Sequence, residues 1–167
     1  MRVAIVGSGP SGFYAASRIL HSFDAQCGTG ENGVDIHMYE RLPTPFGLVR
    51  YGVAPDHPEV RNVENKFDEV ARDPRFTFLG NVQVTGGADV LPSAAVPIPL
   101  SCMAPYYTHI LFAYGASDAR HLHLPGTGPD GLRHIHTAFD FVQWYNGHPD
   151  AHTPDAPFPR MEGHDLR

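Results

Sequence analysis

The sequence predicts an α/β fold of the Rossmann-like type, in which helices flank a parallel sheet. The chain opens with apolar, strand-forming residues at 3–6, which are followed by a glycine-rich run at 7–12 and a helical pattern up to Gly28. A second apolar strand at 34–39 ends in an acidic residue. Strands that alternate with helical segments in this way favour a parallel sheet.

The glycine-rich run predicts a turn that binds the phosphates of a dinucleotide. Gly7 permits a sharp turn, Gly9 lets the backbone approach a pyrophosphate, and Gly12 lets the helix pack closely on the strand. The start of that helix carries unpaired N–H groups and a partial positive charge. Glycines at this spacing also occur in ordinary turns, so the strand before the run and the helix after it carry the argument.

Glu40 follows the second strand, where an acid accepts hydrogen bonds from the adenosine ribose and repels a 2′-phosphate. It lies 28 residues after Gly12, whereas about 20 is usual. The surplus fits a loop at 27–33. A solvated surface carboxylate is the alternative interpretation of Glu40.

Composition limits the classes of function. Of the 167 residues 42% are hydrophobic and 11% aromatic, as in soluble globular proteins, and no apolar stretch approaches the ~20 residues of a transmembrane segment. A net charge of −6 argues against nucleic acid as a partner. Cys27 and Cys102 form no CxxC pair, and no Cys or acidic cluster accompanies the eleven histidines, so we expect no metal site. A disulfide is an open alternative to a reduced, intracellular protein.

The most specific sequence segment begins at Glu40 and reads ERLPTPFGLVRYGVAPDHPEVRNV, residues 40–63. Its Pro and Gly residues are typical of a surface loop, but Phe46, Leu48 and Val49 favour packing against a flat cofactor ring. The segment resembles the adrenodoxin reductase family, NADPH-dependent flavoenzymes that reduce ferredoxins. The resemblance continues through FTFLGNVQV at 76–84, ILFAYGA at 110–116 and FVQWYNGHP at 141–149.

The resemblance implies a site for FAD. The glycine turn would hold the pyrophosphate, Glu40 the ribose, Leu48 the flavin side of the cofactor and Val84 the adenine through its backbone. A place in the apolar core is the alternative for Leu48 and Val84. The implied cofactor-binding residues are Gly7, Gly9, Ser11, Gly12, Glu40, Leu48 and Val84.

The family's reaction passes electrons from NADPH through FAD to a ferredoxin, an adrenodoxin-like iron–sulfur protein. No catalytic residue is assigned. His57 is a candidate for proton handling, and bracing of a Pro-rich turn is the alternative. Family resemblance implies the mitochondrial matrix, with or without contact with the inner membrane, or the cytoplasm of a bacterium. The opening segment is not expected to be a signal peptide, because the glycines at 7–12 interrupt any signal-peptide core, and no organelle presequence is visible either.

Family members are several times longer, and no second glycine fingerprint follows a strand here. We therefore expect residues 1–147 to form the N-terminal part of an incomplete FAD-binding domain. Residues 148–167 would be an extended, poorly ordered, Pro-rich connector toward a missing NADP-binding domain. The chain alone would be inactive as a reductase. A non-catalytic flavin-binding fragment or interaction module is the alternative function. The Pro-rich stretch at 88–101 departs from the short helix of the family.

Overall fold

A computed structural model describes residues 1–28, 33–86, 95–116, 119, 124–127, 132 and 135–152. Some of the eleven histidines, such as His121, and residues 153–167 of the expected connector lie outside this part of the chain. Contacts divide the chain into two compact units, Met1–Gly115 and Ala116–Arg167. In the described part, no helix is both long and apolar enough to cross a membrane.

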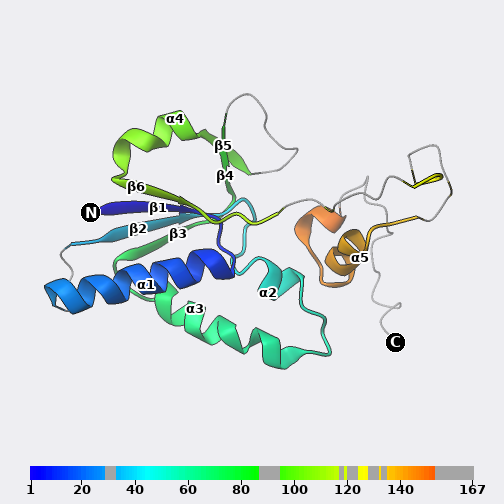
Figure 1. The fold of residues 1–167 in the computed structure, drawn as a ribbon, viewed down its shortest axis with the longest axis horizontal. Coiled ribbons are helices and arrows are strands. Elements are labelled where there is room, and N and C mark those ends of the chain that lie inside the picture. Colours follow the sequence, from blue (N-terminus) through cyan, green and yellow to red (C-terminus); the bar gives the residue numbers. More distant parts are fainter. Residues whose placement is uncertain are drawn as a thin grey trace. The chain divides into compact units, whose positions relative to one another are not determined.

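A four-stranded parallel sheet in the order β3-β2-β1-β6 forms the centre of the first unit (Figure 1). This sheet confirms the predicted fold class. Val3 pairs with Ile36 and with His109, so β1 lies in the middle of the sheet and is buried along most of its length. The strands are β1 (Arg2–Val6), β2 (Asp35–Tyr39), β3 (Phe76–Leu79) and β6 (His109–Phe112).

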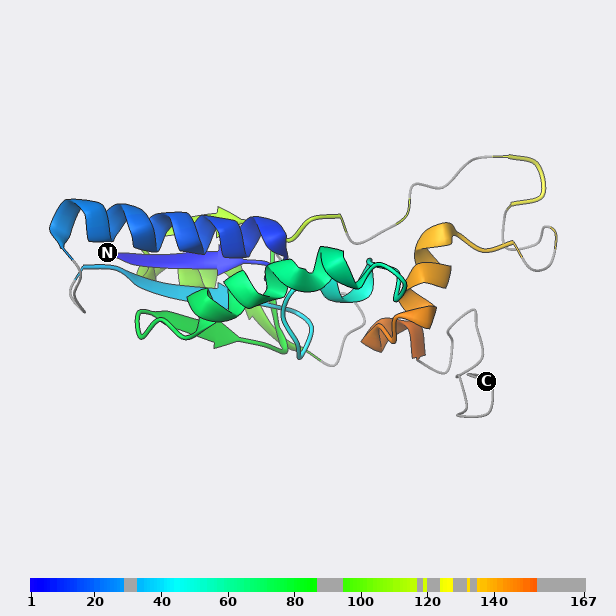
Figure 2. The same ribbon diagram turned by 90° about the horizontal axis from the view of Figure 1, so that it is seen from below.

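Two helices, α1 (Pro10–Cys27) and α3 (Val63–Ala71), cover one face of this sheet (Figure 2). Their apolar residues bury the alternate side chains of β1 and β2 in the main core. Phe13 of α1 and Phe67 of α3 stack with their ring centroids 4.9 Å apart, and each ring is almost completely buried. This packing fixes α1, and hence the glycine turn that precedes it, against the sheet.

The other face carries a smaller parallel sheet of β4 (Val82–Thr85) and β5 (Val96–Pro99), followed by α4 (Leu100–Met103) (Figure 1). The segment at 76–84 forms two strands, because the chain turns at Asn81, whose φ is +59°. Asn81 is exposed and accepts this left-handed conformation more readily than most residues.

The prolines of β5 fit a strand at the edge of a sheet. Val96 donates its N–H to the carbonyl of Asn81 at 2.8 Å. In a strand, alternate residues direct their backbone N–H groups to the same side. The backbone nitrogens of Pro97 and Pro99, which carry no hydrogen, therefore lie on the side of β5 away from β4, where no bond to β4 is lost. The Pro-rich stretch at 88–101, which departs from the short helix of the family, therefore includes a strand over 96–99.

The remaining elements are short, and one of them contradicts an expectation. Within the second unit, Pro149 begins a 3₁₀ turn, so the expectation of an extended chain from residue 148 is wrong for the first residues of that segment. Proline suits a first helical position, since its φ is fixed near −65° and its missing N–H has no partner there. These elements are α2 (Leu48–Tyr51), η1 (Pro58–Asn62), η2 (Ala104–Tyr106), α5 (Ala138–Tyr145) and η3 (Pro149–His152).

Candidate functional site

The glycine turn joins the carboxyl end of β1 to α1 and leaves no space for side chains at two of its glycines. Gly7 has φ +107°, and its N–H donates to the carbonyl of Tyr39 at 2.8 Å. A Cβ on Gly7 would lie 2.5 Å from the carbonyl oxygen of Ala113. A Cβ on Gly12 would lie 2.2 Å from the carbonyl oxygen of Gly7. Both glycines are therefore required by the fold itself.

Gly9 differs from these two glycines, because, apart from Gly9 itself and its two chain neighbours, no heavy atom lies within 4 Å of the position where its Cβ would be. Its backbone is extended, with φ −76° and ψ −176°, which any residue can adopt. It is the N-cap of α1, whose first residue, Pro10, has no N–H. Ser11 follows and is exposed. The first N–H groups of α1 have no acceptor in a preceding helical turn. The space beside Gly9, next to these groups, is open and could hold an anion.

Glu40 is bound to the glycine turn. Its Oε2 accepts hydrogen bonds from the N–H of Ser8 at 2.9 Å and from the Ser8 hydroxyl at 2.6 Å. Its Oε1 accepts one from the N–H of Leu42 at 3.0 Å. These contacts exclude a freely solvated carboxylate and place the acid beside the turn. Sequence reasoning missed Ser8, although a hydroxyl residue between two glycines is a visible signal.

The loop after Glu40 closes on the same turn. The N–H of Phe46 donates to the carbonyl of Ser8 at 2.9 Å. Phe46 has φ +88°, is buried, and its ring centroid lies 5.2 Å from that of Phe13. A Cβ on Gly47 would lie 3.2 Å from the Cα of Gly9. Phe46 and Val49 therefore pack in the protein core.

The other predicted contacts lie in different surroundings. Leu48 is 64% exposed and so remains available to a ligand. Val84 is half-buried and packs in the second core, between the large sheet and α4. His57 is exposed, with Nδ1 3.3 Å from the Oε1 of Glu59. The binding roles of Leu48 and Val84 and the proton-handling role of His57 stay predictions.

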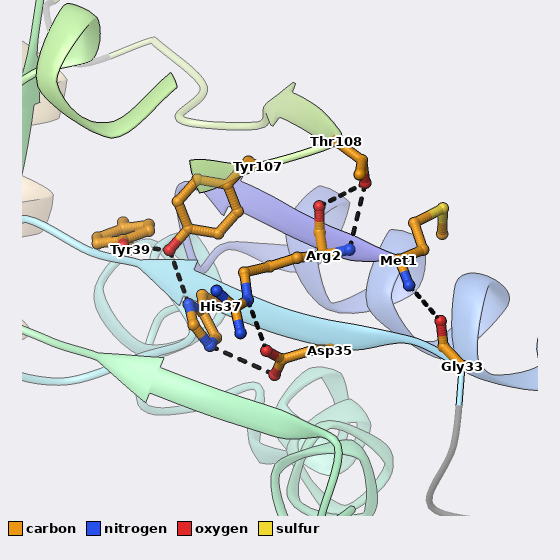
Figure 3. A network of polar contacts seen from close by, with 8 residues as sticks. All are labelled: Met1, Arg2, Gly33, Asp35, His37, Tyr39, Tyr107 and Thr108. Atoms are coloured by element: carbon orange, nitrogen blue, oxygen red, sulfur yellow. Dashed lines mark hydrogen bonds and ion pairs between the residues drawn. The ribbon is translucent and has the colours of Figure 1, made fainter. Parts of the chain in front are cut away.

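A second polar cluster lies across the face of the sheet that α4 covers (Figure 3). The Tyr107 hydroxyl lies 2.5 Å from the Tyr39 hydroxyl and 2.7 Å from Nδ1 of His37. Nε2 of His37 lies 3.3 Å from Asp35, which also accepts from Nε of Arg2 at 2.8 Å. Burial, followed by the bond to Tyr39, raises the pKa of Tyr107 well above its usual range. Sequence reasoning missed this chain of contacts.

The parallel sheet, the glycine turn and the acid bound to it at the carboxyl ends of β1 and β2 define the class, a Rossmann-like dinucleotide-binding domain. Known proteins similar in sequence are reductases by name. The chain is 44% identical over 155 residues to NADPH-ferredoxin reductase FprA of Mycobacterium leprae, covering 92% of this chain and 30% of that protein. It is 43% identical over 150 residues to the mitochondrial NADPH:adrenodoxin oxidoreductase of Arabidopsis thaliana, covering 90% and 27%.

The human mitochondrial NADPH:adrenodoxin oxidoreductase is 44% identical over 149 residues, which are 89% of this chain and 26% of that protein. The solved structure of Mycobacterium tuberculosis FprA in complex with NADPH matches with a TM-score of 0.71 and 42% identity, over 89% of this chain and 29% of that one. No family model matches the chain. The resemblance to the adrenodoxin reductase family is thus confirmed over nearly the whole chain, which spans 30% or less of these relatives' length.

Proposed function

We propose that the chain supplies the FAD-binding part of a flavoprotein oxidoreductase that passes electrons from NADPH to a ferredoxin or adrenodoxin-like iron–sulfur protein. The observation that carries the proposal is the Glu40 carboxylate, held against the glycine turn at the carboxyl ends of parallel strands. That arrangement suits the adenosine ribose and pyrophosphate of a dinucleotide. The choice of FAD rests on the resemblance to the family.

The residues present fit such a cofactor. The open space beside Gly9 and the start of α1 would receive the pyrophosphate. Oε1 of Glu40 accepts one hydrogen bond from the protein and so retains a lone pair for a ribose hydroxyl. Exposed Leu48 adjoins Gly47, which lies against Gly9, so its side chain is placed to contact the rest of the cofactor. The bound flavin supplies the hydride and electron chemistry, and these residues bind and orient it.

In this proposal, residues 1–147 belong to the FAD-binding domain, and residues 148–167 are the connector to a domain that binds NADP(H). For a eukaryotic source the compartment we propose is the mitochondrion, as in the names of the plant and human relatives. For a bacterial source it is the cytoplasm. Similarity to both groups supports either source.

Binding of FAD tests the cofactor assignment. We expect the purified chain to quench flavin fluorescence on binding, and Glu40→Gln to weaken binding by about 1.5–3 kcal/mol through loss of a charge-assisted bond. Glu69→Gln, an exposed change on α3, is the matched control and should bind FAD normally. Tighter binding of NADP⁺ than of FAD at this site would refute the assignment.

A chimera tests the reaction. Residues 1–147 would replace the matching segment of a mycobacterial FprA, and NADPH-driven reduction of a ferredoxin would be measured with FAD in excess. We expect turnover, and expect Glu40→Gln in the chimera to lower its flavin content. A chimera that holds FAD and fails to reduce ferredoxin would favour the alternative, a flavin-binding module without reductase function.

A further inference from the structure

We propose that Ser8 is a positioning residue for ribose recognition, because it fixes the carboxylate of Glu40 so that only Oε1 is presented to a ligand. The proposal rests on the proposed function, since it assumes that Glu40 meets a ribose. Ser8 is completely buried, so its own hydroxyl does not reach a bound molecule. It acts through the acid.

The hydrogen bonds determine which oxygen is presented. Both donors of Ser8, the N–H at 2.9 Å and the hydroxyl at 2.6 Å, bind Oε2 of Glu40. A carboxylate oxygen has two lone-pair directions, so Oε2 is fully used. Oε1 accepts the N–H of Leu42 at 3.0 Å and has one direction left. The carboxylate is therefore held at both oxygens, with a single free acceptor position.

The backbone of Ser8 is itself held on its other side. Its carbonyl accepts the N–H of Phe46 at 2.9 Å. Phe46 keeps an unusual left-handed conformation, with φ +88°, and its buried ring packs against Phe13. Bulky residues adopt this conformation only where the surroundings determine it. The turn and the loop therefore hold the backbone of Ser8 in place beside Glu40.

Removal of the hydroxyl should therefore loosen the carboxylate without emptying the site. In Ser8→Ala the N–H of residue 8 still donates to Oε2, but the second donor is lost. Glu40 is then held by two donors instead of three, and Oε2 regains a free acceptor direction. The carboxylate no longer presents Oε1 alone, so the bond to a ribose hydroxyl weakens. We expect about three- to tenfold weaker FAD binding, which is less than the loss of a direct bond to a charged group because Ser8 acts only through Glu40.

The test compares ADP with 2′,3′-dideoxy-ADP as competitors of FAD on the purified chain. The two probes differ only in the ribose hydroxyls, so the ratio of their dissociation constants reports ribose recognition. We expect the wild-type chain to bind ADP about tenfold more tightly than the dideoxy analogue, because the analogue lacks one hydrogen bond to a charged acceptor. In Ser8→Ala the ratio should fall at least threefold. Thr108→Val, which removes a hydroxyl bonded to Arg2 far along the sheet, should leave the ratio unchanged.

Two results would overturn this proposal while leaving the proposed function intact. One is a Ser8→Ala variant that binds both nucleotides more weakly at an unchanged ratio, which is the behaviour of a merely structural residue. The other is a fall in the ratio that is additive with that of Glu40→Gln, since a residue acting through Glu40 has no effect once the acid is neutralised. If Ser8→Ala does not fold, Ser8→Cys decides the question, because its weaker donor should give an intermediate ratio. A wild-type chain that binds neither FAD nor ADP would refute the proposed function, and this proposal with it.

Discussion

Gly9 offers a substitution that should damage binding while leaving the stability of the fold nearly unchanged. In Gly9→Ala the new Cβ meets no protein atom within 4 Å, and the extended backbone suits alanine. Alanine reduces the freedom of the unfolded chain, which stabilises a compatible site by about 0.4–1 kcal/mol. Gly9 is the N-cap of α1, where glycine is preferred to alanine by a similar amount, so the two effects nearly cancel and Tm should change by less than about 2–4 °C. The same methyl group would enter the space proposed for the pyrophosphate and should weaken FAD binding by about 1–3 kcal/mol.

Gly12→Ala is the contrasting change in the same turn. Its Cβ would lie 2.2 Å from the carbonyl oxygen of Gly7, far inside the ~3.5 Å of ordinary contact. Because the obstacle is backbone, we expect a loss of about 3 kcal/mol, or roughly 6–12 °C in Tm. Thermal unfolding followed by circular dichroism without FAD gives stability, and flavin fluorescence quenching gives affinity. The reasoning fails if Gly9→Ala retains wild-type affinity for FAD, or if it lowers Tm as Gly12→Ala does.

Further predictions concern other parts of the first unit. In Arg75→Met, the carboxyl groups of Asp24 and Asp73 lose the hydrogen bonds that hold their pKa values below the usual range. That stabilisation is present above about pH 4 and lost as the pH falls, so urea unfolding should show a steeper acid loss in the wild type than in the variant. Tyr107→Phe should lower the free energy of unfolding by about 1–2 kcal/mol. Because burial raises the Tyr107 pKa, wild-type stability should decline as the pH rises above about 10, and less so in the variant. Leu48→Ala should change stability by less than about 0.5 kcal/mol and weaken binding of FAD but not of ADP.

The central fold could be predicted from the sequence because its signals are local. The apolar strand at 3–6, the glycines after it and the acid at the end of the next strand each report on neighbouring residues. The closure of the loop at 43–47 on the glycine turn could be predicted only in part. The apolar residues of that loop indicated that it packs on something, but not that Phe46 and Val49 fill the protein's own core.

Ser8, the most informative addition to the site, depends on contacts that no local pattern records. Its partners Glu40 and Phe46 are distant along the chain and meet it only after β2 has paired with β1. The break at Asn81 was missed for a related reason, because Val82 bonds to the carbonyl of Glu40 and so leaves the line of β3. The clustering of Tyr107 with His37 likewise requires the chain to pass over the sheet before it returns to β6.

Hydrogen bonding between the strands continues one residue beyond their ends, where the N–H of Gly7 meets Tyr39 and that of Glu40 meets Leu79. The register of β2 therefore decides which side chain emerges beside the glycine turn. Deleting one residue of β2, such as His37, would bring Arg41 to the place of the acid and move the buried side chain of Met38 to the opposite face. A cation would then face the ribose, so the charge at this position would change sign although no residue had been substituted. The length of β2 is thus as much a determinant of ligand choice as the chemistry of Glu40.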